Sequence, residues 1–85
     1  IEVPISVVLA TDVAKAIEVL ESAAAEHPKI VKAPAPKAIV TRLGPDWMGL
    51  ELHAWTEDAA DWLQIRSDIS ASAARALAAA GIILR

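Results

Sequence analysis

Residues 37–56, KAIVTRLGPDWMGLELHAWT, decide the fold, because two alternating stretches flank the pair Pro45-Asp46. Proline pre-sets φ at the first central position of a tight turn and aspartate suits the second, so this stretch predicts a β-hairpin. Side chains alternate along a strand, so one face of the hairpin should be apolar. The facing pairs on that side would be Leu43 with Met48, Thr41 with Leu50, and Ile39 with Leu52.

The opposite face of the hairpin is mixed in character. It would carry Ala38, Val40 and Arg42 across from Gly49, Glu51 and His53, with Trp55 beyond. One apolar face and one mixed face are typical of an antiparallel sheet that is covered on one side only. We therefore expect the helices of this chain to pack on the apolar face.

The segment before the hairpin predicts a strand followed by a helix. Residues 1–10 alternate as a strand does. The period becomes helical after Thr11 and Asp12, which are good N-cap residues, and Pro28 ends the helix. The apolar stripe of this helix would be Val13, Ile17, Leu20 and Ala24.

The segment after the hairpin predicts a second helix from about Ala59 to Ala80. Asp58 is the expected N-cap and Gly81 the residue that ends the helix. Residues 82–84 then begin a fourth strand. The buried stripe of the helix would be Trp62, Ile65, Ile69, Ala73, Ala76 and Ala80.

The expected order of elements is β-α-β-β-α-β. With right-handed crossovers and a central hairpin, this is the ferredoxin-like arrangement of the α+β class. We expect a single domain over residues 1–85, with a four-stranded antiparallel sheet and both helices on one face. The first and third strands would lie in the middle, and the other face would be open unless a neighbour covers it.

Composition sets limits on function. A chain of 85 residues makes one domain, and its small core favours association with copies of itself or with the rest of a longer chain. The net charge of −3 argues against nucleic-acid binding, and the absence of cysteine excludes disulfides and thiolate metal sites. The alternation typical of a strand is already present at Ile1, and the last residues of the chain look like the start of another strand. We therefore interpret the chain as a fragment of a longer protein.

The sequence contains no pattern that predicts catalysis or a bound cofactor. Glycine-rich phosphate loops are absent, so we expect no enzymatic activity. Glu51 and His53 lie two residues apart on one strand, but two ligands do not make a metal site; we favour polar residues on a wet or interfacial sheet face. The acidic residues Glu57, Asp58 and Asp61 are best explained as a helix cap with favourable charge at a helix N-terminus.

Three tryptophans have different expected roles. Trp62 should be core, Trp47 flanks an exposed turn, and Trp55 points to the open sheet face. Large aromatics on an uncovered face indicate a contact surface, although Trp55 could equally lie over its own strand neighbours. The candidate residues for a subunit interface are therefore Trp47, His53 and Trp55.

A series of short features runs along the whole chain. In order they are the strand ending in Ala10-Thr11-Asp12, His27-Pro28, Ile30-Val31, Pro34-x-Pro36, Leu43-Gly44-Pro45-Asp46, Leu50-x-Leu52-x-Ala54-Trp55, Arg66 and Gly81-Ile82. In this order and spacing the chain resembles the carboxyl-terminal cytoplasmic domain of the small-conductance mechanosensitive channel family, MscS. It departs from the family where a Pro-aromatic-Pro run usually follows the Gly-Ile pair, because Ile83, Leu84 and Arg85 stand there.

The resemblance implies a membrane channel that is opened by bilayer tension and performs no covalent chemistry. This domain would be part of a ring-shaped vestibule on the cytoplasmic side of the membrane, usually heptameric in the family. Its partners would be other copies of the same subunit and the rest of the parent channel. Its roles would be assembly and the filtering of solutes that reach the pore.

Two other interpretations use the same fold. A regulatory domain of the ACT type binds amino acids between paired domains. Such a domain has a Gly-rich turn after its first strand, whereas this chain has Ala10-Thr11-Asp12 there. The cytoplasmic domain of a metal-cation transporter would want more His and acidic residues at ligand spacing than this chain provides.

Overall fold

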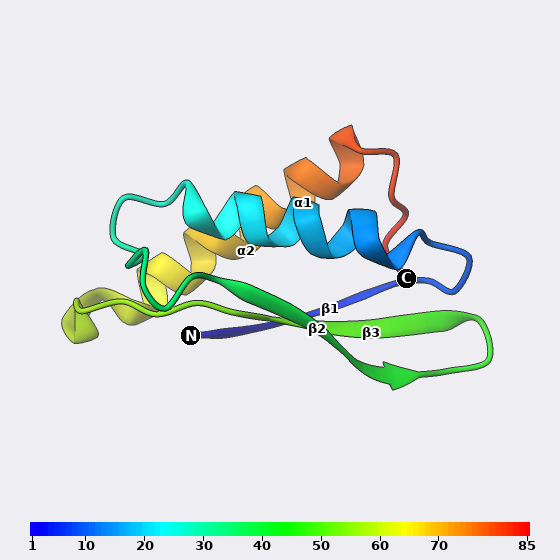
Figure 1. The fold of residues 1–85 in the computed structure, drawn as a ribbon, viewed down its shortest axis with the longest axis horizontal. Helices are drawn as coiled ribbons and strands as arrows, with labels where there is room; N and C mark the ends of the chain where they lie inside the picture. Colours follow the sequence, from blue (N-terminus) through cyan, green and yellow to red (C-terminus); the bar gives the residue numbers. More distant parts are fainter.

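The computed structural model describes all residues from 1 to 85. Three strands, two helices and a short 3-10 turn follow one another along the chain. Figure 1 shows both helices on the same side of the sheet. In order, the elements are β1 (Glu2–Val8), α1 (Val13–Ala25), β2 (Lys37–Leu43), β3 (Trp47–His53), η1 (Ala59–Asp61) and α2 (Trp62–Ala79).

The sheet has three strands in the order β1-β3-β2, and both pairings are antiparallel. The α+β class is therefore confirmed, whereas the expectation of four strands is wrong. The segment after α2 makes only an isolated bridge, between Val7 and Leu84. The backbone N–H of Val8 donates to Ile83 at 3.1 Å and that of Arg85 donates to Ser6 at 2.8 Å. These two bonds lay the segment along the outer edge of β1 without forming a ladder.

The register of the hairpin is correct near the turn and wrong beyond it. Leu43 faces Met48 and Arg42 faces Gly49, as the turn at Pro45-Asp46 predicts. A β-bulge at Thr41 then adds one residue to β2, and such a bulge moves every later side chain to the opposite face. The pairs beyond the bulge are Val40 with Leu50, Ile39 with Glu51, Ala38 with Leu52 and Lys37 with His53.

This shift corrects the expected apolar face of β2. Ala38 is buried, whereas Ile39 is 38% exposed and lies on the other side. Leu43 keeps its predicted partner but is 69% exposed, because it stands beside the turn at the edge of the sheet. Of the seven residues of β2, only Ala38 is buried.

Local sequence signals account for the ends of both helices. Asp12 caps α1 by accepting a hydrogen bond from the backbone N–H of Lys15 at 3.3 Å. At the end of α2, Gly81 has a φ of 77°, a left-handed conformation that glycine adopts without steric cost. The N–H of Ile82 donates to Leu77 at 2.9 Å and that of Gly81 donates to Ala78 at 3.0 Å, which is the Schellman pattern.

The buried stripe of α2 differs from the expected one at both ends. Trp62 is 50% exposed, because it is the first residue of the helix and lines a groove beside Ile1 and Trp55. Ala76 and Ala80 are only partly buried, and they line the groove between the two helices. The fully packed positions are Ile65, Ile69, Ala73 and Leu77, one every four residues.

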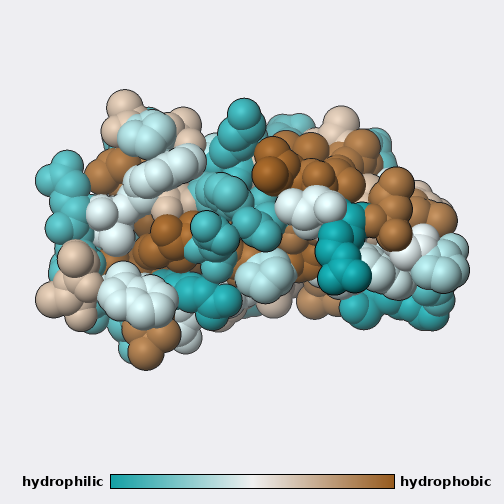
Figure 2. Space-filling view, turned by 90° about the horizontal axis from the view of Figure 1, so that it is seen from below, coloured by the Kyte–Doolittle hydropathy of each residue, from teal (hydrophilic) through white to brown (hydrophobic).

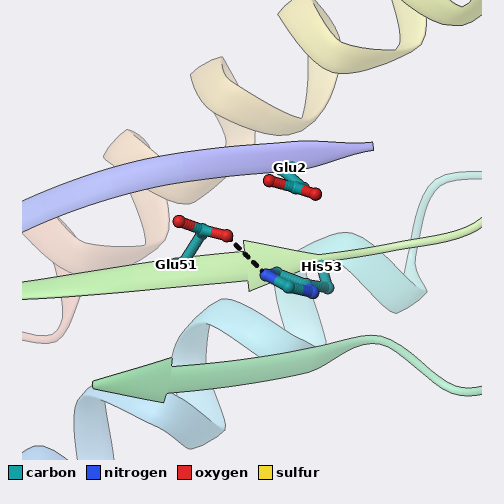
Figure 3. Close-up of side chains that lie close together, drawn as sticks. All are labelled: Glu2, Glu51 and His53. Atoms are coloured by element: carbon teal, nitrogen blue, oxygen red, sulfur yellow. Dashed lines mark hydrogen bonds and ion pairs between the residues drawn. The ribbon is translucent and has the colours of Figure 1, made fainter. Parts of the chain in front are cut away.

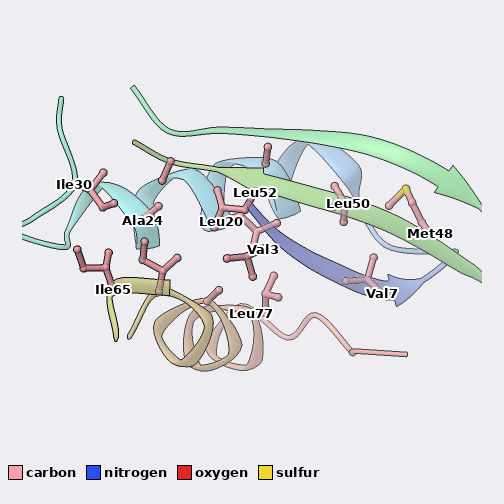
Figure 4. Packing of buried hydrophobic residues seen from close by; sticks show 14 residues of the cluster. Val3, Val7, Leu20, Ala24, Ile30, Met48, Leu50, Leu52, Ile65 and Leu77 are labelled. Carbon is pink, nitrogen blue, oxygen red and sulfur yellow. The ribbon is translucent and has the colours of Figure 1, made fainter. Parts of the chain in front are cut away.

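The core is apolar throughout. It contains 14 buried residues contributed by the strands, the helices and the loop residues Ile30 and Ala54, and no polar or charged residue is buried. Figure 4 shows these side chains between the sheet and the two helices. Neither helix combines the length and hydropathy needed to cross a bilayer.

Candidate functional site on the open sheet face

The face of the sheet that points away from the helices carries most of the polar and aromatic side chains of the strands; we call it the open face. β3 alternates across the sheet, with Met48, Leu50 and Leu52 buried against the helices. Figure 2 shows hydrophobic surface collecting toward the hairpin end and hydrophilic side chains across the middle. By register, the open face comprises Glu2, Pro4, Ser6, Val8, Lys37, Ile39, Arg42, Trp47, Gly49, Glu51 and His53, with Trp55 just beyond.

Trp47 lies flat against the hairpin. Its indole fills the space left by two glycines: a Cβ on Gly44 would lie 1.9 Å from Nε1, and a Cβ on Gly49 would lie 3.3 Å from Cζ3. The guanidinium of Arg42 stacks over the indole, 5.4 Å from its centroid. Glycine is therefore required at position 44 for the indole ring to lie against the hairpin. Trp47 is half-buried as a result.

His53 and Trp55 form the other end of the open face. The Nε2 atom of His53 lies 2.7 Å from Oε1 of Glu51. The ring of Trp55 meets His53 edge-on, with centroids 6.5 Å apart and an interplanar angle of 66°. Trp55 thus contacts its own strand neighbour, yet 40% of it remains exposed.

Glu2 joins this cluster from β1. It stands directly opposite His53 in the β1–β3 register. The ligand atoms of Glu2, Glu51 and His53 all lie within 4.8 Å of one another. Figure 3 shows the three side chains side by side on the two strands. Sequence reasoning found Glu51 and His53 but missed Glu2, because the register that brings β1 onto β3 is not visible in either strand alone.

The other histidine is separate from this cluster and links the two helices. The backbone N–H of Lys29 donates to Nδ1 of His27 at 3.1 Å, so Nε2 carries the proton and donates to Asp68 at 3.0 Å. This bond and one from the amide of Gln64 lower the pKa of Asp68. His27 therefore does more than stand at the end of α1: it ties that end to the middle of α2.

Asp58 caps a helical turn, but this turn is η1 and not α2, whose N-cap residue Asp61 makes no side-chain cap hydrogen bond. Oδ1 of Asp58 accepts a hydrogen bond from the N–H of Asp61 at 3.2 Å. The Lys29 ammonium lies 3.0 Å from Asp61 and 3.1 Å from Asp58. The bonds to these carboxylates raise the pKa of Lys29, and its ammonium lowers the pKa of Asp58. All these groups are exposed at the surface, and Glu57 makes no ion pair.

Two observations relate the chain to known proteins. The family model described as "Mechanosensitive ion channel MscS, C-terminal" matches residues 1–84. No curated protein matches the chain. Among solved structures, the chain is similar to MSL1 of Arabidopsis thaliana, determined by cryo-EM, with a TM-score of 0.80 and 13% sequence identity. The likeness covers 100% of this chain and 32% of that chain, and at this identity it shows a shared fold.

Proposed function

This chain belongs to the family of the C-terminal domain of the mechanosensitive ion channel MscS, and we propose that it forms part of the cytoplasmic vestibule of a tension-gated channel. In this proposal the domain helps to assemble the subunits and filters the solutes that reach the pore. The membrane-spanning part belongs to the rest of the parent protein. The match over residues 1–84 carries the proposal and favours a channel domain over a regulatory amino-acid-binding domain.

The open face supports a role in assembly. Both helices cover the other side of the sheet, so no helix covers Trp47 or His53, whereas Trp55 lies at the edge of this face in a groove that it shares with Trp62. A sheet face that carries two tryptophans and lacks a covering layer is suited to a contact with another protein surface. We propose that these three residues contact a neighbouring subunit or another part of the parent channel.

The arrangement of charged groups supports a role without covalent chemistry. Asp58 caps η1, and Asp58 and Asp61 both bind Lys29. His27 and Asp68 join the helices. Each of these groups has a structural partner, and none of the pairs lies in an enclosed pocket.

The assembly proposal is tested in the full-length protein that carries this chain. We expect Trp47→Ala combined with Trp55→Ala to lower the fraction of assembled channel in detergent, measured by light scattering after size-exclusion chromatography. The matched control is Leu63→Ala, since Leu63 is 65% exposed but lies on α2. Unchanged assembly in the double variant, with the control also unchanged, would refute the interface.

The channel proposal has an independent test. An antibody against this domain should detect a parent protein much larger than 9.0 kDa that stays in the membrane fraction through a high-salt wash. Patch-clamp recording from membranes with and without that protein should then show a tension-activated conductance. A parent found only in the soluble fraction would contradict the channel role whatever the interface variants do.

A further inference from the structure

We propose that Glu2, Glu51 and His53 form a binding site for one divalent transition-metal ion, with Zn²⁺ as the representative, on the open face of the sheet. The site goes beyond the proposed channel role and does not depend on it. The three side chains come from two strands, and Figure 3 shows the carboxylates of Glu2 and Glu51 beside the imidazole of His53.

The distances suit a metal ion without backbone movement. The three candidate ligand atoms lie within 4.8 Å of one another. Zinc binds nitrogen and oxygen at about 2.0–2.2 Å, so two ligands of one ion stand about 3–4 Å apart. Small side-chain rotations of the two glutamates are enough to close this difference.

The sheet holds the ligands in place. Glu2 and His53 are a directly opposed pair on neighbouring strands, whose Cβ atoms stand about 4.5–5.5 Å apart in antiparallel sheets. Glu51 lies two residues before His53, so its side chain leaves the same face. The β1–β3 ladder runs from Glu2 to Val8 without a bulge, and the N–H of Ala54 donates to Ile1 at 2.9 Å beside the site.

The charges at the cluster also favour a cation. Glu2 and Glu51 form no ion pair with any lysine or arginine; the one ion pair in the cluster joins Glu51 to His53. Other acidic groups of the chain do have partners, since Lys29 binds two aspartates before α2. Lys37 stands opposite His53 on β2 but makes no ion pair with either glutamate. A divalent ion would balance two carboxylates and a neutral imidazole.

The donor set selects the class of metal. One imidazole nitrogen with two carboxylate oxygens suits Zn²⁺ and its neighbours, whereas Mg²⁺ and Ca²⁺ prefer oxygen ligands alone. Three protein ligands leave at least one coordination position for water or for a group from another molecule. His53 would bind through Nε2, the atom that now faces Glu51.

The test is titration of the 85-residue chain with ZnCl₂. Calorimetry measures the binding, and the NMR signals of the two histidine rings show where the ion binds. We expect one ion per chain and a shift of the His53 signals with little change at His27. Glu2→Gln and Glu51→Gln should each weaken binding by at least about tenfold, and His53→Asn should abolish it. MgCl₂ at the same concentration should leave the His53 signals in place.

Controls separate this site from adventitious zinc binding. His27→Asn removes the only other imidazole and should leave the affinity unchanged. Acetylation of the amino terminus should also leave it unchanged, because the Ile1 amine donates to Ala54 at 2.8 Å and is not one of the proposed ligands. Absence of binding at millimolar Zn²⁺, full affinity in Glu2→Gln, or loss of binding in His27→Asn would each overturn the proposal.

Discussion

β3 and β2 are both strands of seven residues in the same hairpin, yet they contribute very differently to the molecule. β3 lies in the middle of the sheet and buries Met48, Leu50 and Leu52 against the helices. β2 lies at the edge and buries only Ala38. The alternation in β3 is therefore decided by neighbours on both sides, whereas β2 has room for a bulge and for exposed apolar side chains.

The largest expected effect comes from a buried leucine of β3. Leu52 is fully buried, so Leu52→Ala should lower the free energy of unfolding by about 2–5 kcal/mol through lost burial and the cavity left behind. The matched control is Leu43→Ala in β2, where the side chain is 69% exposed and the loss should stay below about 1 kcal/mol. Urea melts measure the loss of stability in both variants. Equal losses would show that the two strands do not differ in their contribution to the core.

The bulge in β2 predicts a difference between two adjacent residues. Ala38→Ser should cost about 1–3 kcal/mol, because it places a hydroxyl at a buried position of the apolar core. Ile39→Ser should cost less, since Ile39 is 38% exposed on the open face. Urea melts in which Ile39→Ser is the more damaging change would show that the register without the bulge holds in solution.

A glycine outside both strands provides an intermediate effect. Gly81 has a φ of 77° and nothing lies within 4 Å of an added Cβ. Gly81→Ala should therefore destabilise the chain by about 1–2 kcal/mol through backbone conformation alone. Thermal unfolding followed by circular dichroism measures this loss of stability. Ala80→Gly, at the preceding position, is measured as a second variant. An unchanged midpoint in Gly81→Ala would mean that the Schellman turn contributes nothing to stability.

The smallest effect is expected at the bond between His27, which follows α1, and Asp68 of α2. The His27 imidazole and the Gln64 amide lower the pKa of Asp68, so this carboxylate stabilises the fold above the usual aspartate pKa of about 4. The contribution is lost as the pH falls through the lowered pKa. Asp68→Asn should be less stable than the parent chain at neutral pH, and the difference should vanish in acid.

The measurement is urea unfolding of both chains across a pH series. Asp12→Asn is a suitable control, because Asp12 caps α1 through its side chain and asparagine caps equally well. A difference between Asp68→Asn and the parent chain that stays constant with pH would contradict the role of the His27 bond. The effect should be small because Asp68 is substantially exposed.

Signals that act over a few residues predicted much of this structure. The alternation of residues 1–10, the cap at Asp12, the turn at Pro45-Asp46 and the glycine at position 81 are all where they were expected. Asp58 is also a cap, although it caps the 3-10 turn η1 and not α2 itself. Each of these features depends on backbone conformations that neighbouring residues determine by themselves.

The errors have a common physical cause. Trp62 has the right helical phase for burial. It is nevertheless half exposed, because the start of the helix lies at the edge of the core. The fourth strand has the right composition, but a strand also needs a ladder of hydrogen bonds, and only two reach β1. The pattern of β2 cannot reveal the bulge, since a bulge depends on the partner strand.

By itself, the sequence determined the order of elements, their caps and turns, and which face of β3 is apolar, because these follow from periodicity and from local backbone preferences. Only the tertiary structure decided which strand ends meet, and therefore that Glu2 stands opposite His53 and beside Glu51. Register between strands far apart in the chain is set by the summed packing of the whole core. No local pattern carries that information, and the proposed metal site depends on it.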